Sequence, residues 1–166
     1  QYYTDVYNGD PTATTASVQF SVQYGHIAGS GSLDINPLIS GSSPSRIIYG
    51  EYRNLVYGTE TTNFSFDGGT STAEQIYAIN ISRARYKQAL HPGSFNLTLG
   101  SGSNTIYLTD DSNTTSLTRF IGENRVYYII SGSNGNAYTP AASSSYYGMM
   151  FPDLNIRSEE RRVGKE

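Results

Sequence analysis

Short segments of this chain alternate strictly between apolar and polar side chains, which is the period of a β-strand. Between residues 17 and 24, Val18, Phe20, Val22 and Tyr24 alternate with serine and glutamine. Successive side chains of a strand point to opposite faces, so this spacing places the four apolar residues on one face. The segment therefore predicts a half-buried strand.

The same alternation predicts a β-hairpin near the middle of the chain. Leu97 and Leu99 lead up to a Gly-Ser-Gly-Ser sequence at residues 100–103, and Ile106 and Leu108 lead away from it. Two alternating runs separated by a short glycine-containing loop are typical of a hairpin. We expect a four-residue loop here.

Apolar composition predicts the remaining strands. In residues 76–81, Tyr77, Ile79 and Ile81 alternate with their neighbours and lie on one face of a strand. Residues 126–130 form a continuous apolar run, typical of a strand that is buried on both faces or paired centrally. A short strand is expected at residues 64–66, and another begins between residues 146 and 156.

Two short helices are also expected. The first begins at Ser43 and Pro44, because serine caps a helix and proline is tolerated at its first position, and it ends at Gly58. The second runs from Ser82 to Leu90. The residues of the first helix with the spacing of one apolar face are Ile48, Tyr52, Leu55 and Val56.

The composition suits strands joined by turns. Charged residues make up only 15% of the chain, whereas glycine and tyrosine number 17 and 15. Since typical domains carry about 25% charge, hydroxyl and amide groups keep this surface soluble. We expect a mainly β fold, a single-domain β-sandwich or partly open barrel with two short helices, over residues 1–156.

The last ten residues, 157–166, differ from the rest because seven of them are charged. Their sequence resembles the translation of a common short-read sequencing adapter. We expect an artefactual tail that adds nothing to the fold, attached to a fragment from mixed-community sequencing that is truncated after Ile156.

The sequence offers little for catalysis or for holding a cofactor. It contains no cysteine, and its two histidines, His26 and His91, have no metal-ligand spacing around them. Asp110 and Asp111 could resemble a glycosidase pair, but adjacent strand residues point to opposite faces, so a turn after a strand is the better interpretation. We expect no enzyme and no catalytic, cofactor or metal residue.

Charge and hydropathy narrow the choice of partners. Removing the four basic and three acidic residues of 157–166 from the 11 and 14 of the whole chain leaves a net charge of −4. Nucleic-acid binding needs a basic patch, and a membrane-spanning helix needs roughly 20 apolar residues, so neither partner is expected. The candidate interface residues are Arg83, Arg85, Tyr86, Lys87, Tyr52 and Arg53.

Five segments of the chain share a further feature: residues 18–26, 52–56, 80–88, 91–93 and 108–112. Together they resemble a family of virion structural proteins from contractile-tailed (myovirus-type) bacteriophages, especially those of marine cyanobacteria. The resemblance covers most of residues 15–115, and the run from Arg83 to Lys87 followed by Pro92-Gly93 is its most specific part.

The resemblance implies a non-enzymatic structural component of a virion, in the tail or baseplate, with other virion proteins as partners and homo-oligomers expected. The alternative is a fibre or adhesin-like module that binds a host-surface glycan. A shallow groove lined by tyrosine and asparagine would favour glycan binding, whereas a flat patch with unpaired edge strands would favour assembly.

Overall fold

The computed structural model describes residues 2–31, 43–66, 71–85, 88–114, 118–138, 146–154 and 156–160. The chain is mainly β, with 42% strand and 13% helix, which confirms the predicted class. The strands in chain order are β1 (Tyr3–Tyr7), β2 (Val18–His26), β3 (Gln75–Ile81), β4 (Asn96–Ser101), β5 (Asn104–Asp110), β6 (Arg119–Ile121), β7 (Asn124–Ser133), β8 (Asn136–Ala137), β9 (Gly148–Phe151) and β10 (Ile156–Glu160).

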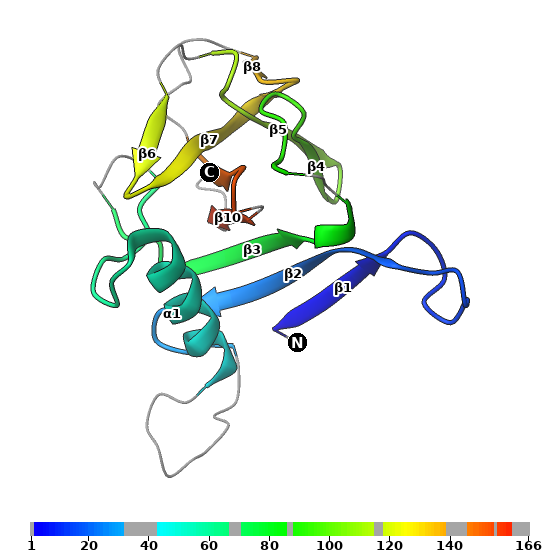
Figure 1. Cartoon of the computed structure of the whole chain (residues 1–166), viewed down its shortest axis with the longest axis horizontal. Helices are drawn as coiled ribbons and strands as arrows, with labels where there is room; N and C mark the ends of the chain where they lie inside the picture. Colours follow the sequence, from blue (N-terminus) through cyan, green and yellow to red (C-terminus); the bar gives the residue numbers. More distant parts are fainter. Residues whose placement is uncertain are drawn as a thin grey trace.

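The strands form a curled, antiparallel sheet in the order β1-β2-β3-β10-β9-β7-β5-β4, with β6 and β8 paired to β7 outside this path. The curl gives the sheet the form of a half-barrel. In Figure 1, β1, β2 and β3 lie on one side of the molecule, and β4, β5 and β7 lie on the other. Strand β10 lies between these two groups.

One α-helix, α1 (Pro44–Tyr57), packs against β2 and β3. The predicted bounds are confirmed, because Pro44 is the first helical residue and Gly58 ends the helix in the left-handed region at φ 68°. The predicted apolar face is wrong at Leu55, which is exposed, and Tyr49 occupies the core instead. The buried face of α1 runs along Ser45, Ile48, Tyr49, Tyr52 and Val56, and Leu55 lies beside it.

Two clusters of apolar side chains form the core. The larger one joins α1 to the sheet and contains Ile48, Tyr49, Tyr52, Val56, Phe64, Phe66, Ala73, Ile76, Ala78, Val126, Met149 and Phe151. The smaller cluster contains Phe95, Leu108, Ile129 and Met150, with Leu97, Tyr127 and Tyr147 against it. This second cluster forms the base of the β4–β5 hairpin.

The predicted hairpin is confirmed as β4 and β5, with a tighter loop than expected. Leu97 pairs with Leu108, and Leu99 with Ile106, and the strands continue as far as Ser101 and Asn104. Gly102 has a φ of 61°, as a two-residue turn with glycine in its first position requires. The predicted strand at residues 126–130 is part of β7, which is paired centrally between β5 and β9.

Two other predicted elements are corrected. The helix expected from Ser82 is a single 3-10 turn, Arg83–Arg85, none of whose residues is buried. Without an apolar face to bury, so short a helix has too little packing to offset its nucleation cost. Phe64 and Phe66 are buried, but residues 64–66 form no strand: the Phe64 N–H donates to the Tyr49 hydroxyl at 3.2 Å, in place of a ladder partner.

Strand β10 takes in Ile156 and the first four residues of the charged segment. Its backbone pairs with β3 on one side, where Arg157 lies opposite Ile79, and with β9 on the other, where Arg157 lies opposite Met150. The adapter origin of residues 157–166 stays a prediction. Residues 157–159 lie opposite partners on both β3 and β9, and Glu160 lies opposite Ile76 of β3 alone.

Candidate functional site

The six predicted interface residues do not gather on one surface. Tyr52 and Arg53 belong to α1, beside the beginning of β3, whereas Arg83 and Arg85 follow its end (Figure 1). Tyr86 and Lys87 lie outside the described residues. The exposed members are Arg83 and Arg85, and the Arg85 guanidinium donates to Ser17 Oγ at 2.8 Å.

Tyr52 is a core residue of this chain. Only 6% of it is exposed, and its hydroxyl donates to Gln23 Oε1 at 3.1 Å. Burial raises the pKa of Tyr52 to about 12. The neighbouring Arg53 is half-buried, donates to Asn63 Oδ1 at 2.9 Å, and lies 5.6 Å from the ring centroid of Tyr49. Both side chains therefore stabilise the packing of α1.

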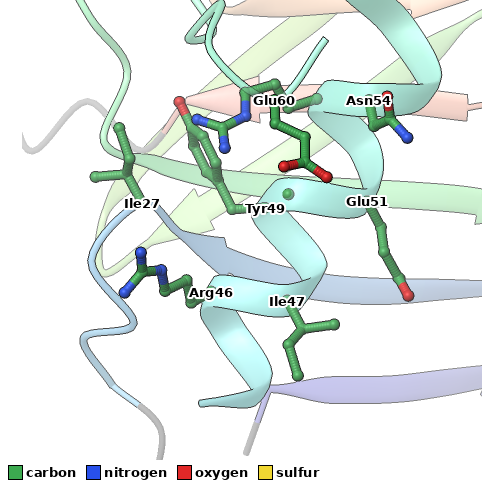
Figure 2. Close-up of a pocket in the computed structure, with 9 residues that line it drawn as sticks. Ile27, Arg46, Ile47, Tyr49, Glu51, Asn54 and Glu60 are labelled. Atoms are coloured by element: carbon green, nitrogen blue, oxygen red, sulfur yellow. The ribbon is translucent and has the colours of Figure 1, made fainter. Parts of the chain in front are cut away.

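A cavity of about 500 Å³ lies along α1 (Figure 2). Arg46 and Tyr49 line it from the helix, and Ile27 and Glu60 line it from the flanking loops. Its charged groups are of both signs, and in Figure 2 the Glu51 and Ile47 side chains point away from Tyr49. This mixture offers no set of groups that converges on one ligand chemistry.

A shallow groove of about 420 Å³ crosses β1, β2 and β3. Tyr3 donates to Asp5 Oδ1 at 2.6 Å on one side of it, and this hydrogen bond raises the pKa of Tyr3. The other lining residues are Val18, Ser21, Asn80, Ile81, Ser82 and Arg83. The groove thus combines an aromatic ring with amide, hydroxyl and charged groups.

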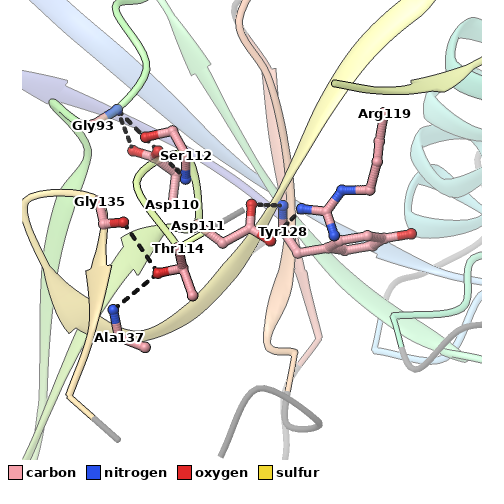
Figure 3. Close-up of polar contacts among 9 residues, drawn as sticks. All are labelled: Gly93, Asp110, Asp111, Ser112, Thr114, Arg119, Tyr128, Gly135 and Ala137. Carbon is pink, nitrogen blue, oxygen red and sulfur yellow. Dashed lines mark hydrogen bonds and ion pairs between the residues drawn. The ribbon is translucent and has the colours of Figure 1, made fainter. Parts of the chain in front are cut away.

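Asp110 is fully buried at the end of β5 and accepts backbone hydrogen bonds from three residues, of which Figure 3 shows Gly93 and Ser112. The Gly93 N–H lies 2.9 and 3.0 Å from its two oxygens, and the N–H groups of Phe95 and Ser112 lie 3.4 and 3.1 Å away. The carboxylate thereby satisfies donors of the loop that leads into β4. The carboxylate oxygens therefore hold this loop against the end of β5.

Asp111, also buried, joins the hairpin to β7. Its carboxylate accepts the Tyr128 N–H at 3.0 Å and forms an ion pair with Arg119. The Arg119 guanidinium lies 4.3 Å from the centroid of the Tyr128 ring, so Asp111 and the ring hold it from two sides (Figure 3). The predicted turn after the strand is therefore also a buried polar cluster.

A third polar contact completes the base of the hairpin. The buried Thr109 hydroxyl donates to the Phe95 carbonyl at 2.7 Å and accepts the Gly135 N–H at 2.8 Å. Gly135 has a φ of 78°, and an added Cβ would lie 2.7 Å from Asn113 Nδ2, so only glycine fits there. Thr109, Asp110 and Asp111 thus fix the position from which β4 and β5 project.

Beyond this base, the apolar face of the hairpin becomes exposed. Leu97, Leu99, Ile106 and Leu108 share one face, because the pairs Leu97–Leu108 and Leu99–Ile106 lie directly opposite each other. Leu108 is buried, whereas Leu99 and Ile106 are each 43% exposed. We call Leu97, Leu99, Ile106 and the outer edge of β4 the hairpin surface.

The opposite face of the hairpin exposes aromatic rings. Tyr107 is 49% exposed and makes an edge-to-face contact with Tyr138, with ring centroids 6.4 Å apart. Tyrosine is enriched at protein interfaces because one end of its side chain is apolar and the other is polar. Both faces of the projecting hairpin therefore carry groups suited to contact.

The outer edge of β4 differs from the other sheet edges. Within the described part of the chain, no strand pairs with it, and residues 92–109 contain no Asp, Glu, Lys or Arg. At the other end of the sheet, β1 contains Asp5 and a register shift between Val6 and Tyr7. Charges and bulges protect an edge from pairing, so β1 is protected and β4 is not.

The chemistry of metal and membrane sites is not evident in the residues that the structure places. No group of three or more histidines and carboxylates within these ranges could hold a metal ion. His26 is buried, and its Nδ1 accepts the Ala28 N–H at 3.0 Å, which is a loop contact. No helix of the described chain is long and apolar enough to cross a bilayer.

Sequence reasoning identified the hairpin but not its exposed edge. The absence of charge over residues 92–109 was the available signal, because edge strands usually carry charged residues. The Asp110–Asp111 cluster had no comparable signal, since several of its donors come from residues 15 to 17 positions away in the chain.

Comparison with protein-family models, with curated proteins and with solved structures found no match for this chain.

Proposed function

We propose that this chain is a non-enzymatic structural subunit that acts through protein–protein contacts at the hairpin surface. The observation that carries the proposal is the outer edge of β4, which is uncharged and unpaired in the described structure and borders a half-exposed apolar face. Such an edge is a template for another strand, and a soluble monomer would normally protect it. The edge is therefore used by a partner.

The assembly that we propose is the virion of a tailed bacteriophage, within the tail or baseplate. The support is the resemblance of residues 80–88, 91–93 and 108–112 to virion structural proteins, together with a hairpin held rigidly at its base by Thr109, Asp110 and Asp111. We further propose that the half-barrel is the partly open barrel expected from the sequence, extended at β4 by a neighbouring subunit.

Mass spectrometry of density-purified phage particles tests this function. Particles from the community that yields the sequence should contain peptides from residues 88–114, in constant ratio to a major tail protein across the gradient. Recovery of these peptides only from soluble fractions, well away from the particles, would contradict a virion role.

Glycan binding is a second candidate function, because the groove across β1–β3 contains Tyr3, Asp5, Asn80 and Arg83. An aromatic ring beside amide and carboxylate groups can stack on a sugar and bind its hydroxyls. Binding to host surface polysaccharide that Asn80→Ala abolishes, and that Asn63→Ala near α1 leaves intact, would support this function. Equal binding by both variants would exclude the groove.

A further inference from the structure

We infer that the outer edge of β4 pairs antiparallel with the β4 edge of a second copy of this chain, about a two-fold axis at Thr98. This inference rests on the proposed function, because it names the partner of the same hairpin surface. Most soluble oligomers are closed homodimers in which the same patch of both subunits meets itself. The hairpin surface meets the requirements for such a contact.

The first requirement is an edge that can pair with its own copy. Two-fold pairing places each residue opposite a residue of an identical strand, so any charge near the axis meets a like charge. Strand β4 contains no charged residue and no proline, and its central Thr98 is exposed. Strand β1 fails this test, since a two-fold axis at its centre would bring Asp5 against Asp5.

The second requirement is complementary side chains on both sides of the axis. Antiparallel pairing centred on Thr98 places Leu97 of one copy opposite Leu99 of the other, and the reverse. Leu97 and Leu99 already share a face with Ile106 and Leu108. The paired hairpins would thus join two apolar faces into one, covering the exposed parts of Leu99 and Ile106.

The third requirement is that the base of the hairpin has a fixed conformation. The hydrogen bonds of Thr109, Asp110 and Asp111 fix the base of the hairpin, so little conformational freedom remains to be lost when the edge pairs. A second copy always presents the same uncharged edge, with the same spacing of leucines. We therefore commit to a second copy rather than to a different protein as the occupant.

Sedimentation velocity of the whole chain tests the pairing. The wild-type chain should show a monomer–dimer equilibrium, and Thr98→Lys should weaken it about tenfold or more, because two ammonium groups would meet at the axis. Thr105→Lys is the matched control: Thr105 is exposed on the same face but lies on β5, one strand further from the axis. It should dimerise nearly as well as the wild-type chain.

A charge-swap mixture identifies the two-fold axis. Thr98→Lys and Thr98→Asp should each be monomeric, and mixing them should restore a dimer in which lysine lies opposite aspartate. A wild-type chain that stays monomeric at every concentration, or a Thr98→Lys dimer of unchanged strength, would overturn the pairing. If phage particles contain the chain only as a monomer, this inference fails and the proposed function stands. If the chain dimerises in solution but is absent from phage particles, the proposed function fails and this inference stands.

Discussion

The buried carboxylate of Asp110 accepts hydrogen bonds from three backbone N–H groups, so Asp110→Ala should strongly destabilise the chain. The substitution leaves the N–H groups of Gly93, Phe95 and Ser112 without this acceptor in the interior. Unpaired buried donors cost about 1–3 kcal/mol each, and partial relaxation reduces the total to about 3 kcal/mol. Urea unfolding monitored by circular dichroism measures the loss.

Asp153→Ala is the control for that measurement. Asp153 is largely exposed and pairs with Arg125 at 3.2 Å on the surface. Exposed ion pairs contribute about 0–1 kcal/mol, so this variant should unfold close to the wild-type midpoint. Equal losses from both aspartates would contradict a structural role specific to Asp110.

The raised pKa of Tyr52 predicts how the free energy of unfolding changes at alkaline pH. Its pKa is about 12 in the folded chain because its hydroxyl is buried, against 10.0 for a free tyrosine. Between these values the unfolded chain has lost a proton that the folded chain keeps. The stabilisation is therefore complete below pH 10 and decreases as the pH rises toward 12.

The size of this decrease can be measured by unfolding at a series of pH values. Two pKa units correspond to about 2–3 kcal/mol of linked free energy, of which Tyr52 should account for a substantial part. Tyr52→Phe keeps the ring and removes the proton, so its stability should fall less steeply above pH 10. An unchanged slope would show that other groups cause the alkaline loss.

At the scale of elements, α1 contains two glycines whose replacement by alanine should have opposite effects. Gly50 lies within the helix and an added Cβ would contact nothing within 4 Å, so Gly50→Ala should stabilise by about 0.5–1 kcal/mol. Gly58 has equal space but a φ of 68°, so Gly58→Ala should destabilise by about 1 kcal/mol. Thermal unfolding compares the two, and effects of the same sign would contradict the assigned helix end.

Local sequence was sufficient for elements whose signals lie within a few residues. Pro44 and Gly58 predicted both ends of α1, because proline at the first helical position and glycine after the last act on the adjacent backbone. Alternation predicted β2 and the β4–β5 hairpin for the same reason. Ser43 occupies the N-cap as expected, but its side chain makes no capping hydrogen bond. Leu55 was misassigned because the helix positions that are buried depend on the strands against which α1 packs, and these are distant in the sequence.

The elements and contacts that were missed depend on distant residues. Nothing within residues 64–66 indicates that the Tyr49 hydroxyl replaces a ladder partner there. The order of the strands was also beyond local reasoning, since β10 lies between β3 and β9. For the candidate site, the hairpin was predictable, but its free edge depends on which strands pair elsewhere.

For the molecule as a whole, β10 is the strand that connects the two halves of the sheet. Ser158 lies opposite Ala78 and Met149, and Glu160 lies opposite Ile76, all three of which are buried. Ser158 has apolar partners on both neighbouring strands and Glu160 has one on β3, and this register favours an apolar residue at the two positions. The double variant Ser158→Val and Glu160→Val should therefore raise the free energy of unfolding by about 2 kcal/mol.

Glu160→Gln separates charge from apolar packing in this prediction. It removes the negative charge without adding apolar surface, so it should recover only a small part of the gain. Denaturant unfolding of the three proteins decides the question. A double variant no more stable than the wild-type chain would indicate that residues 157–160 do not pack, as expected for an adapter-derived tail.

The position of β10 also bears on the rate of folding. Strands β3 and β10 are hydrogen-bonded neighbours, although β4, β5, β7 and β9 lie between them in the sequence. Contacts between residues that are far apart in the sequence form slowly, because the loop between them must close first. Pairing of β10 with β3 should therefore be among the slow steps in the folding of this chain.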